Sequence, residues 1–205
     1  MSSSCSAPGL RRNYARFSQQ QVDEIFTAAA REMVLHSLDL AEMAVEETCM
    51  GQVEDKFTKN HYAAEYIFNS YKDLKTVGCI KHAVGEGIDE IATPVGPIAA
   101  ICPTTNPTAT VIAKSLMALK SGNAVLFLPH PRARRCSAKA AELVLAAAVA
   151  AGAPDGVVQC IESVSLEVTQ HVLKHPKCRF ILATGGDAMV RSSYSSGKPC
   201  LGVGA

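Results

Sequence analysis

The 205-residue chain has no tryptophan, and aromatic residues make up only 5% of it. Its charges nearly cancel, because 20 lysines and arginines face 19 aspartates and glutamates, for a formal net charge of +1. This balance excludes a bulk electrostatic attraction to nucleic acid or to an acidic membrane surface, so we expect neither as a partner. No apolar run approaches the roughly 18 residues of a membrane-spanning helix.

The N-terminal stretch MSSSCSAPGLRRNYARF lacks the apolar centre of a signal peptide. Its serines and basic residues leave a transit peptide as an alternative, but we expect a flexible terminus over residues 1–17. The eight cysteines are scattered, form no C-x-x-C pair and lie partly in apolar runs, which is typical of reduced thiols. We therefore expect a cytoplasmic protein without disulfides.

Several motifs that identify a site are also missing, namely the dinucleotide fingerprint G-x-G-x-x-G, the nucleophile elbow G-x-S-x-G and the zinc motif H-E-x-x-H. His171 and His175 have the i, i+4 spacing of zinc ligands on a helix, but no third ligand accompanies them. We expect them to be surface histidines, and we expect no metal site.

The first part of the chain has the apolar period of helices. A helix is predicted from Ser18 as its N-cap, a second ends at Gly51 as its C-cap, and a third covers 53–75. The larger apolar members of the third helix are Phe57, Tyr62 (or His61), Tyr66 and Phe68. Two edge strands around a turn at Gly85 to Gly87 complete a predicted unit over residues 18–95.

From Gly96 onward, short apolar runs alternate with helical segments. Strands with near-continuous apolar character, each followed by a helix, predict a parallel sheet with right-handed crossovers. The fold class is therefore α/β, with N-terminal helices followed by a mainly parallel, Rossmann-like sheet over residues 96–205. The five expected strands are 97–102, 123–129, 156–161, 179–184 and 199–204.

Ligands of such sheets bind beyond the carboxyl ends of the strands. The first strand ends in CPTTNPT, where Asn106 is placed either to cap the next helix, which we favour, or to donate its amide to an oxyanion. The fourth ends in ATGGDAMV, where two glycines would admit a phosphate or form a tight turn of positive φ. Asp187 in that turn would repel a phosphate.

Three arginines follow the second strand in LPHPRARR, at Arg132, Arg134 and Arg135. Positive charge in the first turn of a helix opposes its dipole by about 0.3–1 kcal/mol per residue. This cost indicates either an anionic partner, such as a nucleotide or coenzyme A, or a basic turn paired with acidic neighbours. The residues alone predict a ligand-binding domain without an obvious nucleophile.

Four stretches together carry a resemblance: PVGPIAAICPTTNPTATVIAKSLMALKSGNAVLFLPHPRAR, AAGAPDGVV, ILATGG and SYSSGKPCLGVGA. They resemble the aldehyde dehydrogenase half of the bifunctional aldehyde–alcohol dehydrogenases and the stand-alone CoA-acylating aldehyde dehydrogenases. The likeness covers about Tyr14 to Ala205, and the N-terminal helices favour the bifunctional type. Motifs VEETCMG and LPHPRA argue against a third alternative, a related reductase of acyl phosphates.

The resemblance implies an NAD-binding domain whose cofactor mode does not use G-x-G-x-x-G. It also implies a reversible reduction of an acyl-CoA by NADH to an aldehyde, through an acyl-enzyme on a cysteine. Asn106 matches the amide that supports the oxyanion. The family's cofactor contacts fall on Ile101, Cys102, Pro103, Thr104, Thr105, Asn106, Gly186 and Gly204.

Two departures from the family pattern stand out. The chain has Gly186, Asp187 and Ala188 where the family has Gly-Pro-Gly, and no cysteine has the surroundings of the nucleophile, which belongs after Gly204. We expect a cofactor-binding portion, truncated before the catalytic domain and inactive alone. The alternative is a non-enzymatic nucleotide-binding or docking protein that joins full-length homologues, which form filaments. The choice between NAD and NADP and the identity of the acyl group stay open.

Overall fold

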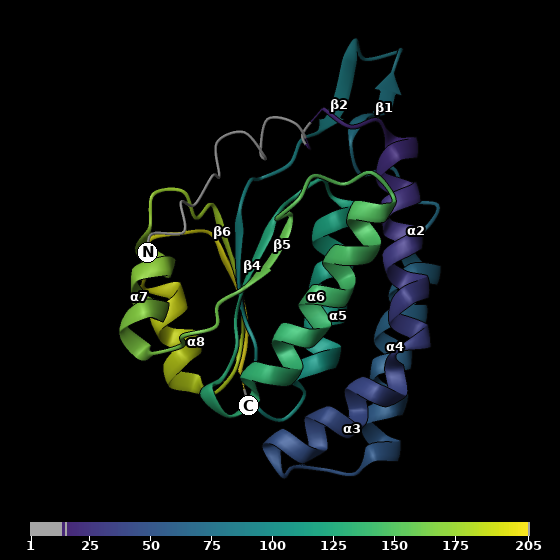
Figure 1. The fold of residues 1–205 in the computed structure, drawn as a ribbon. Coiled ribbons are helices and arrows are strands. Elements are labelled where there is room, and N and C mark those ends of the chain that lie inside the picture. The colour runs from purple at the N-terminus through teal and green to yellow at the C-terminus, as the bar shows by residue number, and fades with distance from the viewer. Residues whose placement is uncertain (1–13, 15, 205) are drawn as a thin grey trace.

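The computed structural model describes residues 14 and 16–204, and its centre is a parallel five-stranded sheet in the order β5-β4-β3-β6-β7 (Figure 1). All four pairs of neighbouring strands are parallel, and Ile98 of β3 pairs with both Val125 of β4 and Phe180 of β6. All residues of β3 are buried, as in a strand covered on both faces. The predicted strands are confirmed, as β3 (Ile98–Ile101), β4 (Val125–Leu128), β5 (Val158–Cys160), β6 (Phe180–Thr184) and β7 (Cys200–Val203).

Helices cover both faces of this sheet (Figure 1). Helices α5 (Pro107–Lys120) and α6 (Arg134–Ala150) lie on one face, where the core contains Phe127 and Val158. Helices α7 (Leu166–Lys174) and α8 (Asp187–Tyr194) lie on the other, around Ile181. The alternating strands and helices therefore form the α/β domain that the sequence predicts, as a doubly wound sheet with helices on both faces.

Helices α2 (Gln19–Leu35), α3 (Ser37–Thr48) and α4 (Val53–Tyr71) form a further layer outside α5 and α6 (Figure 1). The predicted N-cap is confirmed, because the Ser18 side chain accepts from the Gln21 backbone in a capping box. The predicted C-cap at Gly51 is wrong. Helix α3 ends at Cys49, whose φ of 54° is left-handed and whose N–H donates to Val45.

Among the larger apolar residues predicted for α4, Phe68 packs against the core beside Phe26, with the ring centroids 5.5 Å apart. Phe57, Tyr62 and Tyr66 are exposed, whereas α4 buries Lys56, Asn60, Ala63 and Ala64. Small residues let α4 approach α5 closely. Lys56 donates to the loop after β3, and Asn60 bonds to Ser37 of α3 and Thr108 of α5. Every helix within the described residues is too short or too polar to span a bilayer.

A two-stranded hairpin extends from one end of the molecule (Figure 1). It consists of antiparallel strands β1 (Gly78–Ala83) and β2 (Ile88–Ala92), which confirms the predicted turn at Gly85 to Gly87. Most of the predicted flexible terminus, residues 1–17, lies outside the described residues. Tyr14 near its end is 3% exposed, and its hydroxyl donates to the carbonyl of Leu119 at 2.7 Å.

Candidate functional site

A cleft of about 630 Å³ lies where the chain reverses its direction across the sheet. The chain winds outward from β3 to β5, and then returns to place β6 beside β3 and β7 beyond it. In open α/β sheets this switch point leaves a crevice at the carboxyl ends of the strands. The cleft collects those ends from β3 (Ile101–Thr105), β4 (Leu128–Arg132), β6 (Thr184–Gly186) and β7 (Val203 and Gly204). The start of α7, with Val164 and Ser165 before it and its first residue Leu166, forms a further wall.

The loop after β3 is held from behind by buried polar groups of α4. Lys56 is 2% exposed, and its Nζ donates to the carbonyl of Thr105 at 2.9 Å. Asn60 accepts from the Thr108 hydroxyl at 2.8 Å and donates to the carbonyl of Ser37. Burial lowers the pKa of Lys56, and the neighbouring Lys59 lowers it further. The outer helices therefore fix the position of one cleft wall.

Lys114 is a second buried cation beside the cleft, and the sequence analysis did not identify it. Its Nζ donates from α5 to the carbonyls of Ile101 at 2.7 Å and Leu182 at 2.9 Å, so it bridges β3 and β6 at the switch point. Burial lowers its pKa to about 8, although Cys102 and Cys200 act in the opposite direction. No motif indicated this lysine, since in sequence it lies within an ordinary helical period.

Asn106 stands at the N-cap position of α5, but its side chain makes no capping hydrogen bond. The prediction that the side chain of Asn106 caps this helix is therefore wrong. The backbone of Asn106, with φ −146° and ψ 63°, does not have the extended conformation of a usual N-cap. Its carbonyl accepts from the Thr110 hydroxyl. Asn106 does not line the cleft itself, whereas the five residues before it do.

The glycines after β6 form an extended turn. Neither Gly185 nor Gly186 has positive φ, so the tight turn that the sequence suggested is absent there. A Cβ on Gly186 would meet nothing within 4 Å, so the cleft is open above this backbone. Across from it, a Cβ on Gly204 would lie 3.0 Å from Oδ1 of Asp187. The Asp187 carboxylate therefore lies beside the end of β7.

The arginine-rich turn contacts the rest of the protein through its backbone N–H groups and through Arg132, while the side chains of Arg134 and Arg135 are exposed. Both carboxylate oxygens of Glu47 accept from the N-terminus of α6, at 2.8 Å from the N–H of Arg135 and 2.7 Å from that of Cys136. Arg132, in the 3-10 turn η1 (Pro131–Ala133), donates to the carbonyl of Thr48 at 3.1 Å. Glu47 is thus an acidic neighbour of this turn, but it bonds to backbone N–H groups and not to a guanidinium. Arg132 also lines the cleft, where an anionic partner would meet it.

The cysteines near the cleft are thiols rather than thiolates. Cys102 lines the cleft with 2% of its surface exposed, and burial raises its pKa to about 12 although Lys114 lowers it. Burial also raises the pKa of Cys160 to about 12, and it raises that of Cys200. A nucleophilic cysteine needs the opposite shift. The seven described cysteines are free, and Cys5 lies outside the described residues.

Of the two candidate zinc histidines, His171 lies on α7 and His175 is the C-cap that follows it, with an extended backbone. Their ring centroids are 5.7 Å apart, and His171 is exposed. Neither belongs to any group of three metal-ligating side chains in the described part of the chain.

A profile of the Aldehyde dehydrogenase family matches residues 6–199 of the chain. The bifunctional aldehyde-alcohol dehydrogenase AdhE of Escherichia coli (strain K12) is 52% identical over 195 residues, which are 95% of this chain and 22% of that protein. The chain thus spans about a fifth of the length of this curated relative.

Solved structures give the same result. An acetylating aldehyde dehydrogenase from Geobacillus thermoglucosidasius superposes with a TM-score of 0.94 at 45% identity, over 96% of this chain and 44% of that one. An engineered glycolyl-CoA reductase with bound NADP+ superposes with a TM-score of 0.79 at 33% identity, over 97% of this chain and 45% of that one. The chain belongs to the aldehyde dehydrogenase family, and it matches one part of its CoA-acylating members.

Proposed function

We propose that this chain forms the dinucleotide-binding part of a CoA-acylating aldehyde dehydrogenase. The observation that carries the proposal is the switch-point cleft, which brings Ile101–Thr105, Gly186 and Gly204 together from β3, β6 and β7. Those are seven of the eight positions to which the family resemblance assigns cofactor contacts, and the eighth, Asn106, does not line the cleft. The engineered relative that binds NADP+ has the same fold over nearly all of this chain, which supports a nucleotide in the cleft.

The residues present fit such a ligand. The open backbone at Gly186 lets a phosphate or ribose approach without meeting a side chain, and Arg132 supplies positive charge on the β4 side. Asp187 disfavours a phosphate at the start of α8, so we expect the phosphates to lie toward Arg132. The bound cofactor would supply the hydride that reduces an acyl group to an aldehyde. In the complete reaction, acyl-CoA, NADH and a proton become aldehyde, CoA and NAD+.

Asn106 is the proposed amide donor to the oxyanion, since its side chain makes no capping bond that it would have to break. We expect this chain alone to show no acylating activity. The thiol that lines the cleft, Cys102, has its pKa raised to about 12, and burial also raises the pKa of Cys160 and Cys200, so none of these three is an activated nucleophile. Free thiols are typical of a reducing compartment, so we propose a cytoplasmic location.

The test is a fluorescence titration of the purified chain with NADH, and in a parallel arm with NADPH. The variant Gly186→Val narrows the cleft in a backbone conformation that valine adopts readily, with φ −65° and ψ 159°. We expect it to weaken binding about tenfold, or ~1.4 kcal/mol. The matched control is Gly85→Val, at an equally open position in the hairpin turn. Absence of saturable binding by either nucleotide up to about 1 mM, or an equal loss in the control, would refute the proposal.

A second candidate is a docking protein for full-length homologues. The observation in its favour is the edge strand β7, on which Leu201 and Val203 are 62% and 65% exposed. An apolar edge strand offers both backbone hydrogen bonds and buried area to another chain. Size-exclusion chromatography of the chain mixed with a full-length bifunctional homologue tests this candidate. Co-elution that Leu201→Lys abolishes would support it, and independent elution would reject it.

A further inference from the structure

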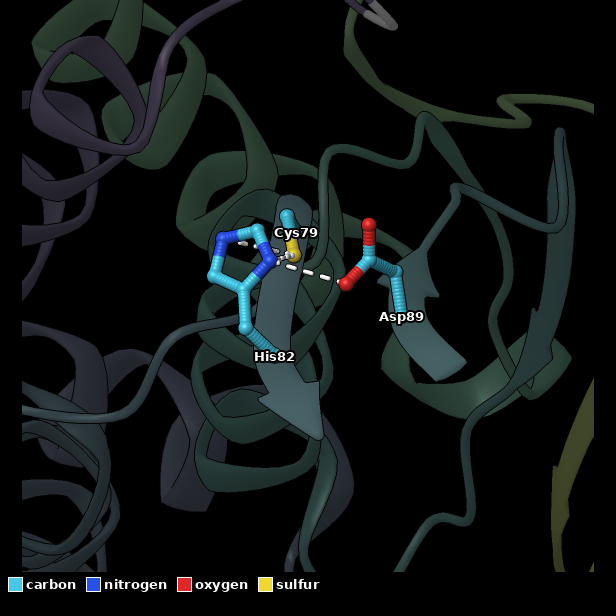
Figure 2. Close-up of side chains that lie close together, drawn as sticks. All are labelled: Cys79, His82 and Asp89. Atoms are coloured by element: carbon cyan, nitrogen blue, oxygen red, sulfur yellow. Dashed lines mark hydrogen bonds and ion pairs between the residues drawn. The ribbon is translucent and has the colours of Figure 1, made fainter. Parts of the chain in front are cut away.

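The hairpin far from the cleft carries a cluster of three side chains with metal-ligand chemistry. Cys79 and His82 come from β1 and Asp89 from β2, and Figure 2 shows the sulfur and the carboxylate directed toward the imidazole. The Nδ1 atom of His82 is 2.9 Å from Oδ1 of Asp89 and 3.5 Å from Sγ of Cys79. One ligand atom from each residue lies within 4.8 Å of the others. This cluster departs from the expectation that the chain has no metal site.

A β-bulge brings these residues to one face. Side chains three apart on a regular strand point to opposite faces, so Cys79 and His82 would normally diverge. The register shifts between Cys79 and Lys81, because Cys79 pairs with Ile91 while Lys81 already pairs with Glu90. The extra residue returns Cys79 to the face of His82, whose direct cross-strand partner is Asp89. Bulges occur at sheet edges and next to active sites, where they redirect a side chain or end the pairing.

The two charged side chains on the opposite face of the hairpin form an ion pair with each other. Lys81 and Glu90 are cross-strand partners there, with Nζ and Oε1 3.2 Å apart. The lysine charge therefore does not neutralise the carboxylate of Asp89. A thiolate and a carboxylate on the cluster face would carry two negative charges beside a neutral imidazole, which a divalent cation cancels.

We propose that Cys79, His82 and Asp89 form a Zn2+ site on this hairpin. Thiolate sulfur, imidazole nitrogen and carboxylate oxygen are the three ligand types that zinc uses, at roughly 2.3, 2.0 and 2.0–2.2 Å. Tetrahedral angles at those lengths separate ligand atoms by about 3.3–3.6 Å. The Sγ–Nδ1 separation of 3.5 Å already fits this geometry, whereas the Nδ1–Oδ1 separation of 2.9 Å has to widen by about 0.4 Å. Sγ also lies 3.3 Å from Nε2, so the imidazole has to turn slightly to direct Nδ1 at a metal shared with the sulfur and the carboxylate. Calcium and magnesium prefer oxygen ligands, so the donor set disfavours both.

We expect a water molecule as the fourth zinc ligand. The side chains of His82 and Asp89 are 68% and 60% exposed, so solvent reaches the metal. An isolated two-stranded hairpin is marginally stable, and this one lacks a third strand in the described part of the chain. A metal that joins β1 to β2 would hold the two strands together. The proposal is independent of the nucleotide cleft, which none of the three residues lines.

The experiment is a calorimetric titration of the full chain with Zn2+, reduced with a phosphine that does not chelate metals. We expect one Zn2+ per chain in the micromolar range, and Co2+ in its place should show thiolate-to-metal charge transfer. Cys79→Ser and His82→Gln should each weaken binding more than about tenfold, the smallest loss typical of removing even an outer-shell partner. Zn2+ should slow the hydrogen exchange of the amides of residues 78–92 and leave the exchange rates of the five-stranded sheet unchanged.

Two controls separate this site from unspecific thiol binding. Cys49→Ser removes another exposed thiol, and Lys81→Gln alters the opposite face of the same hairpin. Both should bind Zn2+ as the unaltered chain does. The proposal fails if no binding occurs in the micromolar range, or if binding survives in Cys79→Ser or His82→Gln. It also fails if Cys49→Ser abolishes binding.

Discussion

Lys114 carries a charge into the interior between two parallel strands. Its surface is 7% exposed, and two strand carbonyls accept from its Nζ. A buried ammonium loses hydration that two hydrogen bonds restore only in part, which is why its pKa falls to about 8. The residue therefore links β3 to β6 at the switch point while costing stability whenever it is charged.

This conflict predicts a pH dependence of stability. The unfolded lysine titrates near 10.5 and the folded one near 8, so between these values the unfolded chain holds the extra proton. Raising the pH through this window therefore favours folding. The stability of the unaltered chain relative to Lys114→Met should rise from pH 8 to pH 10 by up to about 3 kcal/mol.

Urea unfolding of the unaltered chain and of Lys114→Met at each pH measures this difference, and the comparison cancels the titration of groups that do not interact with Lys114. A difference that stays flat or falls across the window would show that Lys114 is not a desolvated ammonium. The result also bears on the cleft, because a partly neutral lysine at the switch point would change the field that a nucleotide experiences.

The residues of the candidate site were predictable to the extent that the strands were. Ile101 to Thr105, Gly186 and Gly204 follow apolar runs, and the carboxyl ends of parallel strands must meet at one edge. Lys56 and Lys114 were not predictable. Each occupies a position in a helix where lysine is normally solvated, and only the packing of α4 and α5 reveals that it is buried.

At the scale of elements, the contact between α3 and α6 joins the outer helices to the sheet domain. Burial alone would raise the pKa of Glu47, but hydrogen bonds from Cys136 and Arg135 lower it below its usual value. The carboxylate thus caps a helix that follows it by almost ninety positions in sequence (separations of 88 and 89). Its negative charge also offsets the arginines that oppose the dipole of α6.

We expect Glu47→Gln to destabilise the chain by about 1 kcal/mol at neutral pH, as the loss of a helix cap does. A lowered folded pKa contributes stability above the unfolded pKa and loses it as the pH falls through the folded value. The difference from the unaltered chain should therefore shrink in acid. Thermal unfolding from pH 3 to pH 7 measures it. Glu46→Gln, at an exposed neighbour on the same helix, is the control, and an equal effect there would contradict the capping role.

Periodicity predicted the elements better than their ends and faces. The five strands were predictable because buried parallel strands are continuous apolar runs. The end of α3 was missed because Cys49 takes a left-handed conformation that glycine, two positions later at Gly51, would adopt more readily. The bulge at Ile80 was also missed, since nothing in the alternation of β1 marks an extra residue. Long-range contacts decide such details.

At the scale of the whole molecule, one core connects the N-terminal helices with the sheet. Val22, Phe26 and Met33 of α2 belong to the same buried cluster as Phe127 and Val158. Polar contacts reinforce the junction. The buried Nζ of Lys120 forms an ion pair with Asp23 and donates to the carbonyl of Lys72 at 3.0 Å. The side chain of Gln19 accepts from the N–H of Thr76 at 2.8 Å.

The sequence predicted separate units over residues 18–95 and 96–205, and this shared core leads us to expect that they unfold together. Native-state hydrogen exchange tests the expectation. Amides of α2, α5 and β3 should exchange with one common free energy, equal to that of global unfolding, because none of these elements can open without exposing the others' apolar surface. The hairpin should exchange first, since Val84, Ile88 and Ile91 are more than half exposed. Separate free energies for α2 and β3 would instead identify two independent units.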